Sequence, residues 1–515
     1  MARVGFTSGL IVTGLLAAGP VLAGNADKDA VTSEVQQLLN ARHDRKAETL
    51  GRQPTPASIP KHHADADPGG SIETFQPGGA TATKSNAFFQ DLGTNGRTCF
   101  SCHQPDQGWG ISARNVQSRF DQSGGLDPIF RPVDGAVCPT ADTSTLDAKK
   151  NAYSLLLKQG LIRIGLSFPA GAEFTITGVS DRYHCNTDPN TGLTGPASGT
   201  VSIYRRPLPS TNLRFLSTVM WDGREGALLP PQAAPADQPT LIDDLSQQAI
   251  DATLGHAQAA HAPTPAQVKQ IVDFELGLYT AQIVDSAAGR LTSHKAKGGS
   301  IALGQEPFFI GINDPLGLNP DNTPFTPTIF NLYDNWRNLK GGALAQARAA
   351  VARGQAIFNS KPITITGVAG LNDALNAPNI AGSCGTCHDS PNAGDHSVKA
   401  PLNIGIAGAG ADAPPALDTA ALPVFTVQCS VATFFHAANE PFQVTDLGRA
   451  LLSGKCADIG KTKGPVLRGL AARAPYFHNG AAAGLMDVVN FYDQRFGIGF
   501  TDQEKADLVA FLNTL

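Results

Sequence analysis

Two short stretches of the chain bring thiols and an imidazole together at the same spacing. They are Cys99-Phe100-Ser101-Cys102-His103 and Cys384-Gly385-Thr386-Cys387-His388. Two cysteines three positions apart with histidine directly after them are typical of covalent haem attachment, in which the histidine ligates the iron. A zinc site would gather four ligands from paired motifs, and a redox dithiol has no need of the histidine. The motifs therefore predict two covalently bound haem c groups.

Length and composition favour a large protein built from more than one domain. The chain has 515 residues, of which 42% are hydrophobic, so it can form sizeable cores. Its 54 glycines and 36 prolines indicate many loops. The formal net charge is −5 and no basic run is present, which argues against nucleic acid as a partner.

The first residues predict export from the cytoplasm. Arg3 is followed by an apolar stretch and by Val21-Leu22-Ala23, the pattern of a signal peptide over residues 1–23 with cleavage after Ala23. A membrane anchor is the weaker interpretation, because the apolar run is short and is interrupted by glycine and proline. We therefore expect a periplasmic protein with no membrane span in the mature chain, which agrees with covalent haem.

Four cysteines remain outside the two motifs. Cys138 and Cys185 lie in the first half of the chain, and Cys429 and Cys456 lie in the second. In an oxidising compartment such cysteines pair, so we expect the disulfides Cys138–Cys185 and Cys429–Cys456. Free buried thiols are the alternative.

The chain divides around the two motifs. After a lead-in over residues 24–97 we expect a first haem domain over 98–290, a connection over 291–345 and a second haem domain over 346–515. Strand-like alternation at 172–177 indicates a β-rich insertion over about 125–200. The expected fold is mostly α, with two tandem cytochrome c-like domains and β-containing insertions.

Three helices are marked by their caps or their apolar faces. Thr264 and Thr501 each begin a capping box, and residues 481–496 form a further amphipathic segment. The helix after Thr264 has a mostly apolar face, which we expect to be core. That face consists of Val268, Ile271, Val272, Glu275 and Leu278.

Further motifs resemble the bacterial dihaem cytochrome c peroxidase and MauG family. They are the block Trp221-Asp222-Gly223-Arg224 between the haem motifs and the run Ala474-Pro475-Tyr476-Phe477-His478-Asn479-Gly480 near the end. Together with the two haem motifs they cover about two-thirds of the mature chain. The resemblance implies that the first haem is the reactive one and that the second relays electrons.

The resemblance also suggests roles for two aromatic residues. Trp221 matches the tryptophan that lies between the haems, so it is expected to conduct electrons; a plain core aromatic is the alternative. Family members carry Met or Tyr as the distal ligand of the second haem, on the helix after the Ala474–Gly480 run. Tyr492 shares the apolar face of that helix with Leu485, Val488 and Val489, whereas Met486 does not. We expect ligation by His388 and Tyr492; the alternative is a packed Tyr492 with His478 or nothing on the iron.

The first haem pocket is less well defined. Gln248 matches the pocket glutamine of the family, but no acidic residue follows where the family has its proton-transferring glutamate. His256 is the nearest proton carrier. It is a candidate acid–base group, a candidate iron ligand, or an ordinary surface or core histidine. Family members also bind calcium; Pro207 stands where they have an asparagine ligand, which leaves calcium a candidate cofactor through carbonyls around Arg473 and Pro475.

These features together predict a periplasmic dihaem oxidoreductase that reduces hydrogen peroxide. The resemblance implies that electrons come from a small cytochrome c, a copper protein or an oxidisable protein substrate. Two other classes stay open. One is a pure electron-transfer cytochrome, and the other is a dihaem oxygenase acting on O₂ and an organic substrate, as in the distantly similar rubber oxygenases.

Overall fold

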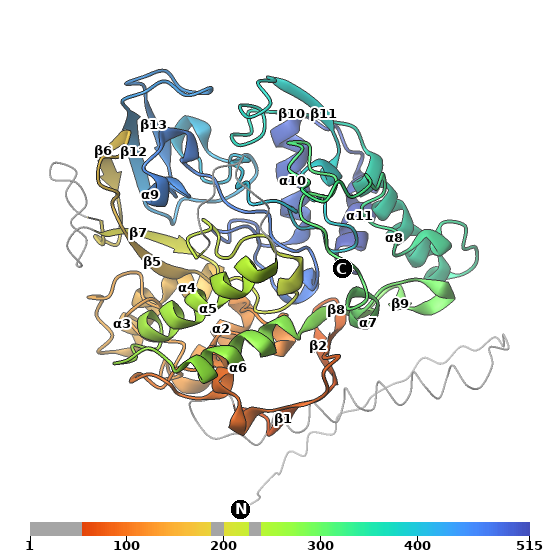
Figure 1. Ribbon diagram of the computed structural model, residues 1–515, viewed down its shortest axis with the longest axis horizontal. Coiled ribbons are helices and arrows are strands. Elements are labelled where there is room, and N and C mark those ends of the chain that lie inside the picture. Colours follow the sequence, from red (N-terminus) through yellow and green to blue (C-terminus); the bar gives the residue numbers. More distant parts are fainter. Residues whose placement is uncertain (1–53, 187–199, 226–237) are drawn as a thin grey trace, which may run out of the picture. The chain divides into compact units, whose positions relative to one another are not determined.

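The computed structural model describes residues 54–186, 200–225 and 238–515, all within the unit Thr49–Leu515. The predicted signal peptide lies outside the described residues. Up to the second haem motif, the helices are α2 (Ala113–Ser123), α3 (Leu146–Ala152), α4 (Ser154–Gln159), α5 (Gln238–Gly255), α6 (Pro265–Leu276), α7 (Ser300–Leu303) and α8 (Ala343–Ser360). The later helices are α9 (Ala450–Ser453), α10 (Leu485–Phe496) and α11 (Asp502–Leu512) (Figure 1).

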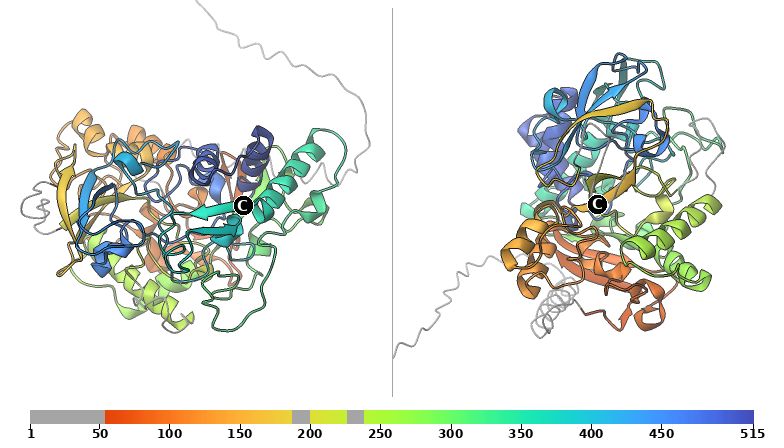
Figure 2. Two further views of the ribbon diagram at one scale, coloured as in Figure 1. Left: turned by 90° about the horizontal axis from the view of Figure 1, so that it is seen from above. Right: turned by 90° about the vertical axis from the view of Figure 1, so that its left-hand side faces the viewer.

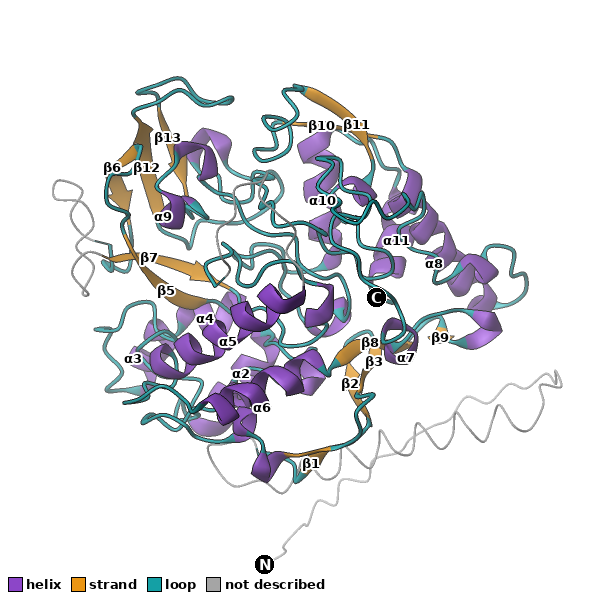
Figure 3. Cartoon of the chain, in the orientation of Figure 1, coloured by secondary structure: helices purple, strands orange, loops and turns teal. Residues whose placement is uncertain are grey.

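Short strands are spread between these helices, as Figure 3 shows. The strands of the first half are β1 (Ser58–Ile59), β2 (His62–Asp67), β3 (Gly70–Phe75), β4 (Thr81–Ala82), β5 (Ile162–Ser167), β6 (Phe174–Ser180), β7 (Thr200–Arg205), β8 (Tyr279–Asp285) and β9 (Gly289–Arg290). The later strands are β10 (Ile363–Thr366), β11 (Asn379–Gly382), β12 (Val424–Cys429) and β13 (Pro441–Val444).

The largest of the described sheets has the order β2-β3-β8-β9 and is antiparallel throughout. Strands β2 and β3 lie in the lead-in, in a part of it whose sequence has no clear periodicity. The turn between them contains Asp67, whose Oδ1 accepts the backbone N–H groups of Gly69 and Gly70 at 2.7 Å each. This Asx-type turn joins two six-residue strands, so the segment Asp67-Pro68-Gly69-Gly70 was a hairpin signal.

A second sheet joins the two halves of the chain. Its order is β13-β12-β6, so strand β6 of the first half pairs antiparallel with β12 of the second (Figures 1 and 2). The expected insertion therefore does not form its strands alone.

Both expected disulfides are confirmed: the Cα atoms of Cys138 and Cys185 are 5.5 Å apart, and those of Cys429 and Cys456 are 5.9 Å apart.

Helices α8 and α11 form the frame around the second haem motif. They cross closely at Gly354, where an added Cβ would lie 2.0 Å from the carbonyl oxygen of Asp507. Arg353 also donates two hydrogen bonds to the Asp507 carboxylate, at 2.7 and 2.8 Å. Glycine is needed at position 354 because any side chain would separate the two helices.

The caps predicted from the sequence are confirmed. Gln267 N–H donates to Thr264 Oγ1 at 3.3 Å at the start of α6, and Glu504 N–H donates to Thr501 Oγ1 at 3.2 Å at the start of α11. The expectation of a mostly α fold is not confirmed, because helices account for 31% and strands for 17% of the structure. The lead-in and the insertion supply much of this strand content. Among the described helices, none combines the length and the apolar character that a bilayer crossing requires.

Candidate haem sites

The two cysteine–histidine motifs fold in the same way. Each begins with a short 3₁₀ helix, Cys99–Ser101 in the first motif and Cys384–Thr386 in the second. A hydroxyl inside each motif caps the turn: Thr98 N–H donates to Ser101 Oγ, and Ser383 N–H donates to Thr386 Oγ1, both at 3.0 Å. The turn brings the two thiols and the histidine to one side of the backbone.

Both histidines are oriented by a backbone carbonyl six residues later. His103 Nδ1 lies 2.9 Å from the oxygen of Trp109, and His388 Nδ1 lies 2.7 Å from that of Gly394. Burial lowers the pKa of both imidazoles, which keeps them neutral. A neutral imidazole that donates through Nδ1 has its Nε2 lone pair free for a metal, which is the usual arrangement of metal-ligating histidines.

The carbonyl that orients His103 is itself held by the sheet of the lead-in. Trp109 is fully buried, and its Nε1–H donates to Thr74 Oγ1 of β3 at 2.8 Å. Thr74 in turn contacts Thr280 of β8 through its hydroxyl, at 3.0 Å. Strands β3 and β8, which lie outside the haem motif in the sequence, therefore fix the position of the first histidine.

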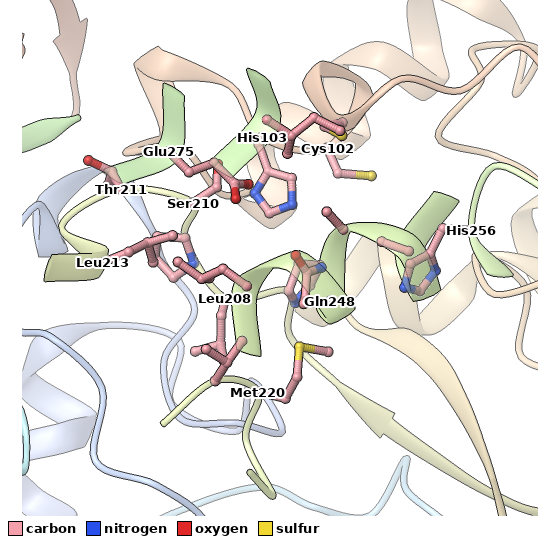
Figure 4. A pocket seen from close by; sticks show the side chains of 18 of the residues that line it. Cys102, His103, Leu208, Ser210, Thr211, Leu213, Met220, Gln248, His256 and Glu275 are labelled. Carbon is pink, nitrogen blue, oxygen red and sulfur yellow. The ribbon is translucent and has the colours of Figure 1, made fainter. Parts of the chain in front are cut away.

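The first cavity is lined by Cys99, Cys102 and His103 on one side and by helix α5 on the other. Figure 4 shows Gln248 across the cavity from His103, and His256 directly after the C-terminal end of α5. The structure thus brings together the glutamine and the histidine that the sequence singled out. Most of the remaining wall is apolar, including Leu213, Val219 and Leu245.

His256 has a defined partner at the rim of this cavity. Its Nδ1 contacts Asp134 Oδ2, and the Asp134 carboxylate also accepts a hydrogen bond from Arg97. These contacts lower the pKa of Asp134 to about 2, although burial alone would raise it. The carboxylate therefore stays ionised and fixes the imidazole, with Nε2 left available for a proton or a ligand.

Glu275 is a residue of the cavity that the sequence analysis placed in the core. It lies on α6 beside His103 (Figure 4), is 5% exposed, and its Oε2 has no hydrogen-bond partner. Burial raises the pKa of its carboxyl to about 8, so it is mostly protonated at neutral pH. The available signal was one carboxylate on an otherwise apolar helix face.

The second cavity is lined by Cys384, Cys387, His388 and one face of α10. That face consists of Leu485, Val488, Val489 and Tyr492, as the helical spacing predicted, while Met486 is 40% exposed. The Tyr492 ring lies against Phe477, Phe491 and Phe496. Burial raises the pKa of its phenol, so a phenolate at this position would require a cation close by.

Trp221 lies in the walls of both cavities, together with Lys463 and Pro465. Its Nε1–H donates to the Arg206 carbonyl at 2.7 Å, its own carbonyl accepts from Lys463 N–H at 2.8 Å, and its ring meets His478 edge-on at 6.1 Å. The Lys463 ammonium donates to Thr218 O at 3.0 Å, and burial lowers its pKa to about 8. Trp221 is thus held between the two sites by its backbone and its side chain.

A buried ion network fixes the loop that carries Trp221. Arg205 at the end of β7 donates to both oxygens of Asp446, at 2.7 and 2.9 Å, and to the carboxylate of Asp222. Arg224 Nη1 also lies 3.2 Å from the Asp222 carboxylate. Breaking such a buried network by removing one partner costs about 3–5 kcal/mol. The network therefore connects β7, the Trp221 loop and the second half of the chain.

The residues of both cavities fit a covalently attached haem. All eight cysteines are described, and the four outside the disulfides are the two motif pairs. Each pair faces a mainly apolar cavity beside a neutral, oriented histidine. Cys99 and Cys102 with His103, and Cys384 and Cys387 with His388, would hold the two groups.

One carbonyl expected to contribute to a calcium site already has a cationic partner. The carbonyl oxygen of Arg473 accepts a hydrogen bond from Arg206 Nη2 at 2.8 Å. The same guanidinium donates to the carbonyls of Ile111 and Gln159, at 2.5 and 3.0 Å. A fixed guanidinium thus already binds the Arg473 carbonyl oxygen, one of those suggested as a calcium ligand.

Comparison with known proteins supports the resemblance inferred from the motifs. The cytochrome-c peroxidase IdrP2 of Denitromonas iodatirespirans is 33% identical over 144 residues, which are 26% of this chain and 36% of that protein. The cytochrome-c peroxidases IdrP1 of the same organism and of Pseudomonas sp. (strain SCT) are 27% and 26% identical over 197 residues, 36% of this chain. The chain is similar to cytochrome-c peroxidases. Its predicted resemblance to the dihaem peroxidase and MauG family is thereby confirmed.

The matches cover part of each relative. The aligned residues span 36% of IdrP2, and 44% and 43% of the two IdrP1 proteins. No protein-family model matches the sequence. A solved structure of a MauG-like protein associated with microbial copper homeostasis aligns over 84% of this chain and 86% of that chain, with 16% identity and a TM-score of 0.35.

Proposed function

We propose that the protein is an exported dihaem c-type oxidoreductase that reduces hydrogen peroxide at the first cavity. Electrons would reach that cavity from the second one through Trp221. The observation that carries this proposal is the position of Trp221, which is one of the residues that line both cavities. The similarity to cytochrome-c peroxidases gives the reaction class.

The first cavity offers the polar groups that peroxide reduction requires. Reduction of H₂O₂ to two molecules of water consumes two electrons and two protons. Haem held by His103 would supply an iron centre that binds peroxide and accepts the electrons. The Gln248 amide can orient the peroxide by hydrogen bonding. His256, held by Asp134, can deliver a proton through Nε2, and the protonated Glu275 stores another in the same cavity.

The second cavity is suited to electron transfer rather than to peroxide chemistry. Its wall is largely apolar, and none of the described residues that line it carries a carboxylate. We propose that His388 and Tyr492 would both hold the iron of a haem bound there. A phenolate ligand would favour the oxidised iron and would hinder access of a substrate to it. The electron donor would be a small cytochrome c, a copper protein or an oxidisable residue of a protein substrate.

Spin state and turnover test this proposal directly. We expect electron paramagnetic resonance of the ferric protein to show one high-spin and one low-spin haem, and the protein to oxidise a reduced cytochrome c when peroxide is added. Gln248→Ala should lower that turnover. Gln247→Ala is the matched control, because Gln247 is exposed on the same helix and bonds to Asp251.

Three outcomes would refute the proposal. Two low-spin haems with no response to peroxide would indicate a pure electron carrier. Oxygen consumption with an organic substrate, without peroxide turnover, would indicate an oxygenase. Equal turnover in the Gln248→Ala and Gln247→Ala variants would remove Gln248 from the reaction.

A further inference from the structure

Three potential metal ligands converge beside the second haem motif. They are Asp314 in the connection between the halves, Asp389 directly after His388, and His396. One ligand atom from each lies within 4.8 Å of the others. Asp389 is fully buried and His396 is 5% exposed. Asp314 and Asp389 line neither haem cavity, whereas His396 belongs to the wall of the second one, and the proposed peroxide reaction uses none of the three.

The carboxylates are held so that one oxygen of each remains free. Asp314 Oδ2 accepts from Leu318 N–H at 3.0 Å, and Asp389 Oδ1 accepts from Ser397 N–H at 2.7 Å. The other oxygens, Asp314 Oδ1 and Asp389 Oδ2, are buried without a hydrogen-bond partner. Each such group costs about 1–3 kcal/mol when it is left unsatisfied.

His396 is unpartnered in the same way. Both of its ring nitrogens are buried and neither has a hydrogen-bond partner. Its Nδ1 lies 3.4 Å from Asp389 Oδ2, which is close enough for an ion pair. A cationic histidine would balance only one of the two carboxylates, whereas a dication with a neutral imidazole balances both.

Hydrogen bonds to backbone carbonyls hold the loops of the cluster together, although these loops are far apart in the sequence. Asn313 Nδ2 donates to the carbonyl of Asp389 at 3.1 Å, and Ser397 Oγ donates to the carbonyl of Ile312 at 3.1 Å. Gly311 N–H donates to the carbonyl of Ser397 at 3.2 Å. The loop of Asp314 is thus fixed against the loop of His396, and the ligands are placed before any ion arrives.

We propose that Asp314, Asp389 and His396 bind a divalent first-row transition ion, Zn²⁺ or Mn²⁺. An imidazole nitrogen with two carboxylates suits these ions, whereas Ca²⁺ and Mg²⁺ take oxygen ligands. Zinc–ligand distances are about 2.0–2.2 Å, so the ligand atoms close in slightly around the ion. Asp389 follows His388 directly, so the ion stabilises the loop that presents the second haem ligand.

Metal content relative to haem content tests the site. The protein with both haems is purified without added chelator; haem is measured by pyridine haemochrome and metals by mass spectrometry. We expect one zinc or manganese per chain in addition to two haem irons. If the metal is zinc, extended X-ray absorption fine structure at the zinc edge should show a shell of nitrogen and oxygen ligands at about 2.0 Å.

Two matched variants identify the ligands. Asp314→Asn keeps an oxygen that can accept from Leu318 N–H but removes the charge, so zinc affinity measured by equilibrium dialysis should fall by about 100-fold or more. Asp321→Asn makes the same change at an exposed position in the same segment and should leave zinc affinity unchanged. Removal of the ion from the wild-type protein with a chelator should lower its Tm.

The proposal is wrong if the purified protein contains only haem iron and takes up no zinc or manganese on dialysis. It is also wrong if Asp314→Asn binds as much metal as Asp321→Asn does. Either result can occur while peroxide turnover is intact, so this test is independent of the proposed reaction.

Discussion

The acid stability of this protein should depend on one buried histidine next to Trp221. His478 is 3% exposed, and its Nε2 lies 3.6 Å from Asp446 Oδ2 without a hydrogen bond. Burial lowers its pKa from 6.5 to about 4; Asp446 opposes this shift, and Arg205 adds to it. The imidazole is therefore neutral in the folded protein at pH 7.

The sign and size of the effect follow from linkage. Between pH 6.5 and pH 4 the unfolded chain binds a proton at this position and the folded protein does not, so folding stability falls as the pH falls. One pK unit corresponds to about 1.36 kcal/mol. The shift of about 2.5 units corresponds to about 3.4 kcal/mol once the pH is well below 4. Between pH 7 and pH 4 the loss through His478 is about 2.8 kcal/mol, because the folded imidazole is itself half protonated at pH 4.

Urea unfolding of the wild type and of His478→Gln at pH 7 and pH 4 measures this quantity. Other groups also titrate in this range, so the prediction concerns the difference between the two proteins. The wild type should lose about 2.8 kcal/mol more than His478→Gln over this interval. His261→Gln, at an exposed histidine, should follow the wild type. Equal losses in the wild type and His478→Gln would refute the buried neutral imidazole.

Two further substitutions test the electron path. Trp221→Phe removes the hydrogen bond to Arg206 O, should cost about 1 kcal/mol of stability, and should slow inter-haem electron transfer in stopped-flow absorption. Trp336→Phe is its control, because Trp336 is fully buried, donates to Ser293 O and lines neither cavity. Equal electron-transfer rates in the two variants would show that Trp221 is only a packing residue. Tyr492→Phe should shift the second haem toward high spin and raise its reduction potential, whereas Tyr476→Phe should do neither, because the Tyr476 hydroxyl already donates to Leu470 O at 2.9 Å. An unchanged low-spin signal in Tyr492→Phe would place the ligand elsewhere.

Features that depend on neighbouring residues could be predicted from the sequence. The haem motifs are five consecutive residues, and their chemistry needs only the local turn that places two thiols and an imidazole together. The capping boxes of α6 and α11 extend over four residues, and the face of α10 follows from its helical repeat. The disulfides could be assigned because each pair lies within one half of the chain.

Other features were missed because the decisive partners are distant in sequence. Strand β6 pairs with β12, about 250 residues later, so no local pattern could have placed it in a shared sheet. The lead-in forms strands because β3 pairs with β8, about 200 residues away. These pairings account for strand content that the sequence did not indicate, since short strands without strong alternation gain most of their stability from such partners.

The sequence alone determined which atoms can attach haem, because thioether formation and axial ligation depend on residue type and on spacing within one turn. Only the tertiary structure decided the surroundings of these atoms. It placed Trp221 in both cavity walls, buried Glu275 beside His103 and raised its pKa, and brought Asp314 to Asp389 and His396. Burial and long-range proximity set the energies of charged groups, and neither quantity exists until distant segments of the chain are packed against each other.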